Sequence, residues 1–378
     1  MLKITLKNTK NSFLLVAVLQ LVIINSLAFS QNPGSSGDNK ARNVILLVGD
    51  GMGIAQIHAA AANAQLNLLS LPHAAIVSTS SDDNDITDSG AGGTALATGV
   101  KTTNGLVGMR ADSSVLKSIL KIAEEYGLST GLIATSDITH ATPASFIANV
   151  PHRSHANEIA RQFLDSGIDV FIGGGLNNFN KRADSINYID SLITRGYYVA
   201  TSLEQLKNHQ SGKLAGLLYP EHPPKMSEGR GDMLSVSTSK ALNTLSQNKD
   251  GFFLMIEGSQ IDWGGHANEI GYVLAELLDF DKAVGIVLDF ARSHPETLVI
   301  VTSDHETGGM TLIEDELMPG KMKPHFSTTH HSATPVPLFA FGKRAELFKG
   351  FMDNTDIFRN IMSAYGFKES GFNKRSNQ

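Results

Sequence analysis

Acidic residues and histidines follow several apolar runs of this chain, and their placement suggests divalent-metal chemistry. Asp50 and Glu257 each stand at the end of an apolar run, Asp304 and His305 end another, and His140 comes shortly after a fourth. A single charged group in such a place is usually a helix cap or one half of a core ion pair. Several of them brought to one edge of a sheet instead favour a divalent metal cluster.

The segment IDWGGH adds a carboxylate and an imidazole four residues apart, at Asp262 and His266. Both can reach one ion if the segment turns helically. The two glycines between them predict an irregular turn, and a loop with a capping Asp262 is the alternative. Carboxylates and imidazoles without thiolates suit catalytic zinc, or magnesium where oxygens dominate. Two cations about 4 Å apart can clamp both oxygens of an in-line phosphoryl displacement, so we expect phosphoryl chemistry.

A candidate nucleophile, Ser89, lies in the small-residue run DSGAGGTA. At the first turn of a helix its neighbours would offer free N–H groups, which favour an anion. The alternative is a plain helix start capped by Asp88 or by Ser89 itself. No His–Asp pair suited to a serine triad is evident near Ser89 in the sequence, so we expect a metal to activate its hydroxyl.

These residues lie in a chain whose predicted strands and helices alternate. Strands are predicted near residues 43–48, 129–136, 169–175, 252–258 and 297–305, and helices near 53–63, 115–126, 157–166, 233–247 and 271–293. This alternation predicts one large α/β domain with a mostly parallel central sheet and helices on both faces. Ligands gather at the carboxyl ends of strands in such sheets. Residues 314–329 are predicted to be an irregular surface insertion.

Composition narrows the class of protein. The chain has 378 residues, of which 42% are hydrophobic, so it can bury a large core. It has 31 Lys and Arg against 37 Asp and Glu, which disfavours a nucleic-acid-binding module. Because it has no cysteine, disulfide frameworks and thiol ligands are excluded.

The first residues predict export. Residues 1–30 combine three lysines, an apolar run and small residues at a cleavage spacing, which is typical of a signal peptide. We expect a Gly/Ser linker over 31–42 and a catalytic domain over 43–378. The apolar run falls short of the ~20 residues that span a bilayer, so an uncleaved anchor is the less favoured alternative. The product would be periplasmic or secreted, with no membrane anchor after cleavage.

Six motifs in order resemble the alkaline phosphatases, and most closely their small, cold-adapted bacterial members. They are NVILLVGDGMG, TDSGAGGTALATG, THATPASF with Arg153 downstream, EGSQIDWGGH, VTSDHETGG and HSATPVPLFAFG. The resemblance implies an alkaline-phosphatase-like fold and hydrolysis of small phosphate monoesters to alcohol and phosphate. It also implies two Zn²⁺ and one Mg²⁺ per chain, and we expect a homodimer.

The resemblance assigns metal ligands position by position. One zinc would take Asp262, His266 and His331, where the spacing to the following strand favours His331 over His330. The second zinc would take Asp50, Asp304 and His305. Magnesium would take Asp50, Thr142 and Glu257, with His140 beside it.

The remaining assignments concern phosphate. Ser89 would be the nucleophile that forms a phosphoserine, and Arg153 would hold two phosphate oxygens. His140 stands where some members have Asp, and Trp263 where others have Lys or His, so we expect Trp263 to tune the grip on phosphate. The other histidines, His222 among them, are expected at surface or core positions.

Two other functions stay open from the sequence. A phosphodiesterase of the same superfamily would share these residues, because pocket shape separates the two activities. A non-catalytic exported protein that binds metal or phosphate is the second alternative, and release of phosphate from an aryl phosphate would discriminate it.

Overall fold

The computed structural model describes residues 39–318 and 320–368, and from Lys40 onward these form one compact unit. The predicted signal peptide, and the predicted linker up to residue 38, lie outside the described residues. Among the residues that are described, no helix is both long and apolar enough to cross a membrane.

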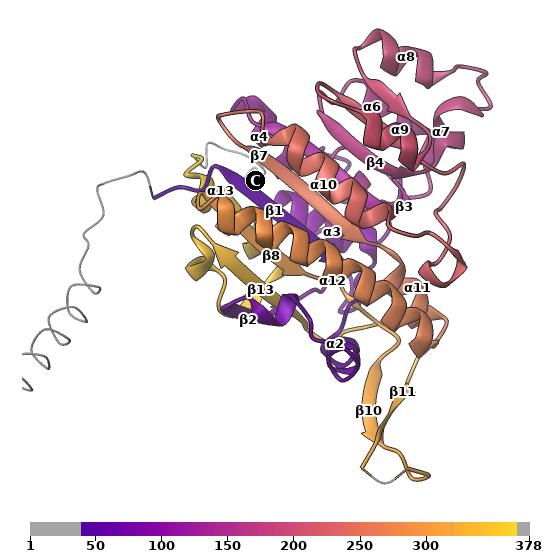
Figure 1. Cartoon of the computed structure of the whole chain (residues 1–378), viewed down its shortest axis with the longest axis vertical. Helices are drawn as coiled ribbons and strands as arrows, with labels where there is room; N and C mark the ends of the chain where they lie inside the picture. Colours follow the sequence, from indigo (N-terminus) through magenta and orange to yellow (C-terminus); the bar gives the residue numbers. More distant parts are fainter. Residues whose placement is uncertain (1–38, 319, 369–378) are drawn as a thin grey trace, which may run out of the picture. The chain divides into compact units, whose positions relative to one another are not determined.

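The unit is built on a ten-stranded sheet (Figure 1). The strand order is β14 (Gly350–Asp353), β2 (His73–Ser78), β13 (Val336–Gly342), β8 (Thr297–Thr302), β1 (Asn43–Gly49), β7 (Phe252–Gly258), β3 (Ser129–Asp137), β4 (Val170–Gly174), β6 (Leu214–Leu217) and β5 (Tyr198–Ala200). Strand β13 is antiparallel to both β2 and β8, and the other pairs are parallel. The predicted single α/β domain with a mostly parallel sheet is confirmed.

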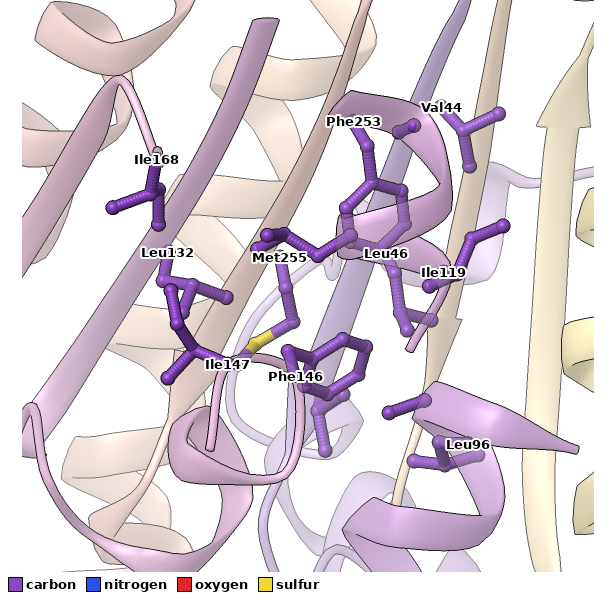
Figure 2. Close-up of a cluster of buried hydrophobic side chains, with 14 of the residues drawn as sticks. Val44, Leu46, Leu96, Ile119, Leu132, Phe146, Ile147, Ile168, Phe253 and Met255 are labelled. Atoms are coloured by element: carbon purple, nitrogen blue, oxygen red, sulfur yellow. The ribbon is translucent and has the colours of Figure 1, made fainter. Parts of the chain in front are cut away.

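Helices cover both faces of the sheet because its central strands are apolar on both sides. All seven residues of β1 are buried. Val44, Leu46 and Val48 join one hydrophobic core, and Ile45 and Leu47 join the other. Such two-sided burial is the usual condition of parallel sheets. Figure 2 shows part of the first core, where sheet residues such as Leu46 lie among helical ones.

The first core is closed by α3 (Ser89–Thr98), α4 (Ile119–Glu125), α6 (Ala156–Leu164) and α13 (Asn354–Tyr365), and the second by α2 (Ile54–Ala61), α10 (Met233–Leu245) and α12 (Ile270–Ser293). Shorter helices are α5 (Ala141–Ala144), α7 (Leu176–Asn180), α8 (Tyr188–Thr194), α9 (Leu203–Asn208) and α11 (Gln260–His266). Three 3₁₀ turns, η1 (Leu68–Ser70), η2 (Met226–Glu228) and η3 (Ala345–Leu347), complete the described helices. Two-stranded pieces pair β10 (Met310–Glu314) with β11 (Met322–Phe326), and β9 (Glu306–Thr307) with β12 (His331–Ser332).

The register of the three central strands brings their carboxyl ends together. Strand β1 lies between β7 and β8, and Val48 is opposite both Glu257 and Thr302. Asp50 and Asp304 each follow two residues beyond this level. The acidic residues after these strands therefore meet at one edge of the sheet, as the sequence predicts.

Two local predictions are wrong. Residues 314–329 are only partly irregular, because they include the turn and the second strand, β11, of the β10–β11 hairpin, where the Asp315 N–H donates to the Lys321 carbonyl. The IDWGGH segment is not an irregular turn, because it lies in helix α11. Its glycines permit close packing: a Cβ on Gly264 would lie 2.7 Å from the Val273 backbone nitrogen.

One predicted helix begins later than expected. We predicted a start near residue 115, but α4 begins at Ile119 because the Ser118 hydroxyl caps it, accepting from the Lys121 N–H at 3.2 Å. Val115 instead forms a bridge with Met109.

Candidate active site

Nine of the predicted residues lie together at the carboxyl edge of the sheet, and eight of them form three groups. Within each group the potential ligand atoms lie within 4.8 Å of one another. The groups are Asp262, His266 and His331; Asp50, Asp304 and His305; and Asp50, His140 and Glu257. Asp50 belongs to the second and third groups, so one carboxylate connects them. The ninth residue, Thr142, has its Oγ1 3.4 Å from Asp50 Oδ2.

In the first group the two imidazoles turn the same nitrogen toward one carboxylate. The Nε2 atom of His266 lies 3.3 Å from Asp262 Oδ2, and the Nε2 of His331 lies 3.6 Å from Asp262 Oδ1. Their Nδ1 atoms contact the carbonyl oxygens of Thr329 at 2.7 Å and Thr87 at 2.8 Å. A nitrogen that faces a carbonyl carries a proton, so Nε2 is the atom of each ring that is directed into the site and that could bind a cation.

The second group surrounds the candidate nucleophile. The Nε2 of His305 lies 3.3 Å from Asp304 Oδ2 and 3.5 Å from Asp50 Oδ1. The same nitrogen is 3.2 Å from the Oγ of Ser89. Asp50, Asp304 and His305 are completely buried, and Ser89 is almost so.

Thr307 connects the first two groups, and the sequence analysis did not identify it. Its hydroxyl donates to Asp262 and lies 3.2 Å from the Nδ1 of His305. This arrangement keeps the His305 Nε2 free to face the carboxylates. Its position two residues after His305 is the one feature of the sequence that could have pointed to Thr307 as a site residue.

Several buried carboxylate oxygens of the second and third groups lack hydrogen-bond partners. Within the described part of the chain, both carboxylate oxygens of Glu257, Asp50 Oδ1 and Asp304 Oδ2 are buried without a hydrogen bond. A buried, uncompensated carboxylate costs several kcal/mol, so such atoms need a counter-charge. The oxygen-rich third group fits a hard divalent cation, with His140 contributing a nitrogen.

Burial and mutual repulsion shape the protonation of these carboxylates. Burial, together with the charges of Asp304, Asp262 and Glu257, raises the pKa of Asp50 well above its usual range. Burial raises the pKa of Glu257 to about 7, and burial with the neighbouring charges of Asp262 and Glu257 raises that of Asp304 to about 7. The raised pKa values mean that ionising these carboxyl groups is unfavourable without a counter-charge, and a bound cation would favour their ionised form.

Asp262 behaves in the opposite way. Although burial opposes ionisation, the hydrogen bond with His266 and the adjacent imidazoles hold the pKa of Asp262 below its usual range. The same hydrogen bond raises the pKa of His266 to about 9.

Helix α3 presents Ser89 to these groups. Asp88 caps the helix by accepting from the Ala91 N–H at 2.9 Å, so the capping alternative is correct for Asp88. The glycines of the helix allow close approach rather than a loose loop. A Cβ on Gly92 would lie 3.0 Å from the Asp304 carbonyl oxygen, and one on Gly93 would lie 2.9 Å from the Ser145 hydroxyl.

The structure also brings Arg153 to this site. Its Nη1 donates to Asp88 Oδ2 at 3.0 Å, and its Nη2 lies 3.2 Å from the Nε2 of His140. The Arg153 side chain is 26% exposed. The guanidinium is thus oriented by an aspartate next to Ser89 while part of it remains accessible to an incoming anion.

Trp263 lies beside the third group. Its ring is edge-on to His140, with centroids 6.3 Å apart, and edge-on to His222, with centroids 4.9 Å apart. His222 was expected at a surface or core position; it is exposed, but it stands at this site, with its Nδ1 accepting from the Asp137 N–H at 2.9 Å. Nothing in the sequence near His222 indicates this position.

Sequence comparison matches residues 41–325 to the alkaline phosphatase family. Alkaline phosphatase 4 of Bacillus subtilis is 36% identical, and the alignment covers 93% of this chain and 96% of that protein. The alkaline phosphatase of Escherichia coli is 29% identical, with 88% of each chain covered.

Structure comparison agrees. The alkaline phosphatase of the Antarctic bacterium TAB5 superposes with a TM-score of 0.83 at 41% identity, covering 87% of this chain and 99% of that one. A variant of that enzyme, in which a histidine is replaced by glutamate, has Mg bound in its M3 site.

Proposed function

Since the chain belongs to the alkaline phosphatase family and is a phosphate-monoester hydrolase, we propose that it acts through a covalent phosphoserine on Ser89. One observation carries the proposal. The Ser89 hydroxyl stands 3.2 Å from a histidine nitrogen that also faces two buried carboxylates. A serine hydroxyl is a weak nucleophile unless such a cluster assists the loss of its proton.

We propose that the three groups hold two Zn²⁺ and one Mg²⁺. Zinc suits the two groups that contain directed imidazole nitrogens, and magnesium suits the group with Asp50 and Glu257, with Thr142 adjacent. When bound, the cations supply Lewis acidity that favours the serine alkoxide and the departing alkoxide.

We assign separate roles in the reaction to Ser89, Arg153 and the N-terminus of α3. The Ser89 hydroxyl gives its proton to solvent, and its oxygen forms a bond to phosphorus while the P–O bond to the ester oxygen breaks and that oxygen takes a proton from solvent. A water molecule then bonds to phosphorus as the bond to the serine oxygen breaks; one proton of the water returns to Ser89, and phosphate is released. Arg153 offers N–H donors to two phosphate oxygens, and its ion pair with Asp88 orients the guanidinium. The N-terminus of α3 adds partial positive charge beside Ser89.

Trapping the intermediate tests this function. The metal-loaded enzyme is mixed with a radiolabelled aryl phosphate, quenched in acid and digested, and we expect the label on the peptide that contains Ser89. Ser89→Ala should lose the label and turnover while keeping its metal content. Label on another residue, or unchanged turnover in Ser89→Ala, would contradict the proposal. A diester assayed in parallel tests the phosphodiesterase alternative, and we expect faster hydrolysis of the monoester.

We also propose export, on the basis of the basic start, apolar run and small residues within residues 1–30. Mass spectrometry of the secreted protein should give a mature chain that begins near residue 31. An intact Met1 in that chain would contradict this.

A homodimer is proposed on the basis of an apolar pocket between α2 and β10. Ile54, Ala55, Met310 and Leu312 line it, and Ile54 is 56% exposed. Light scattering should give twice the chain mass, and Ile54→Glu should lower it to one chain. A monomeric wild type would refute the dimer.

A further inference from the structure

A tight turn over residues 103–106 contacts the backbones of both members of the Asp88–Arg153 ion pair. The Leu106 N–H donates to the Thr103 carbonyl at 3.2 Å, so Asn104 and Gly105 occupy the two central positions of the turn. Gly105 has φ +89° and Asn104 does not have a positive φ, which is the combination of a type II turn, and glycine adopts this conformation without strain. The turn is thus a defined structure rather than a flexible loop.

The Asn104 side chain clamps the segment that leads into Ser89. Its Oδ1 accepts from the Asp88 N–H at 3.1 Å, and its Nδ2 donates to the Ile86 carbonyl at 2.9 Å. The Asn104 backbone N–H donates to Asp83 Oδ1 at 3.1 Å. Three hydrogen bonds from one residue therefore hold residues 83–88 in place.

The next residue along the turn holds the other half of the ion pair. The Gly105 carbonyl accepts from the Arg153 N–H at 2.8 Å. Although burial raises the pKa of Asp88, the hydrogen bond from the Ala91 N–H, the charge of Arg153 and the backbone of Gly105 together hold this pKa below its usual value. Two consecutive residues thus anchor the backbones of both Asp88 and Arg153.

We propose that Asn104 is a positioning residue for phosphate, acting through Asp88 and Arg153. The inference rests on the proposed role of Arg153 in holding phosphate. The guanidinium can present two donors to a phosphate only if its carboxylate partner stays in place. Loss of the Asn104 amide frees the Asp88 backbone and lets the ion pair shift, while leaving the metal-ligand groups unaltered.

The test compares Asn104→Ala with a matched control, Asn248→Ala. Asn248 makes similar bonds, accepting from the Asp250 N–H at 2.9 Å and donating to the Gly127 carbonyl at 2.9 Å, but it lies at the opposite, amino-terminal end of β3. Both variants should lose a similar, small amount of thermal stability. Only Asn104→Ala should raise the inhibition constant for phosphate and the KM, by about three- to tenfold, which is the effect of one hydrogen bond. Metal content should stay unchanged in both.

A double-mutant cycle with Arg153→Ala separates positioning from general loosening. In the Arg153→Ala background, Asn104→Ala should add no further loss of phosphate affinity, because the group it positions is gone. If Asn104→Ala does not accumulate as folded protein, Asn104→Ser carries the same expectation, since its hydroxyl is too short to reach both partners.

The outcomes distinguish the inference from the proposed function. An unchanged phosphate constant in Asn104→Ala, with a raised one in Arg153→Ala, would overturn the inference alone. Equal effects of Asn104→Ala with and without Arg153 would overturn it too. An unchanged phosphate constant in Arg153→Ala would overturn the phosphate-holding role itself.

Discussion

The Nε2 atom of His305 lies 3.2 Å from the Oγ of Ser89, and this nitrogen also faces the carboxylates of Asp50 and Asp304. In a serine triad the acid instead contacts Nδ1 and leaves Nε2 to take the serine proton. Here Nδ1 faces the Thr307 hydroxyl. Two carboxylates also face the His305 Nε2, and a cation among these atoms would relieve their repulsion, so the geometry favours a metal-activated serine over a histidine base.

Metal removal should destabilise the protein. Asp50, Glu257 and Asp304 are fully buried, and several of their oxygens have no hydrogen bond among the described residues. Without cations their charges repel at short range, so we expect a clear fall in melting temperature and loss of activity on chelation. Calorimetry with metal analysis checks this, and added Zn²⁺ and Mg²⁺ should restore both properties. Full activity of verified metal-free protein would rule the mechanism out.

Arg153→Ala should weaken phosphate binding about tenfold or more, because a charge-assisted pair of hydrogen bonds is lost. Arg153→Lys should recover only part of this affinity, since an ammonium group cannot present the planar pair of donors. The inhibition constant for phosphate measures the effect, and metal content serves as the control. Equal affinity in wild type and Arg153→Ala would be incompatible with the role.

Trp263→Lys should tighten phosphate and slow its release. Trp263 lies edge-on to His140, next to the group proposed for magnesium, and its indole carries no charge. An ammonium group in its place would attract a dianionic phosphate. We expect a several-fold lower phosphate inhibition constant, and a lower kcat if release limits turnover. The alternative is a packing role, for which a lower melting temperature with unchanged phosphate affinity would be the sign.

Arg230→Met should destabilise the fold without removing any residue of the candidate site. Arg230 is 1% exposed and contacts two buried carboxylates, Glu276 and, at 3.0 Å, Asp279. Its removal leaves both unpaired, which costs about 3–5 kcal/mol. The exposed pair of Arg292 with Asp289 provides the control, since Arg292→Ala should change the free energy of unfolding by less than about 1 kcal/mol. Urea unfolding measures both, and equal losses would contradict the burial argument.

The residue types along the chain are enough to predict most of the helices and strands and most of the chemistry. Apolar runs such as residues 43–48 predict buried parallel strands because few other structures cover both faces of a strand. The acids that end these runs must then meet at one edge of the sheet, which is why Asp50, Glu257 and Asp304 could be identified together. Residues from distant segments, such as Arg153 and His331, came from the family resemblance, because nothing local to them indicates a site.

Which atoms face one another depends on how distant segments pack together. Gly264 and Gly265 predict an irregular turn because glycine disfavours a helix. They lie in a helix here because Val273 and Thr307 pack so closely against it that no larger side chain would fit. His222 lies beside Trp263 through a contact between a loop and a distant helix, and Asn104 contacts Asp88 across helix α3, which separates them along the chain. Such contacts have no periodicity and arise only when the sheet brings the loops to one edge, so no reading of residue types along the chain could supply them.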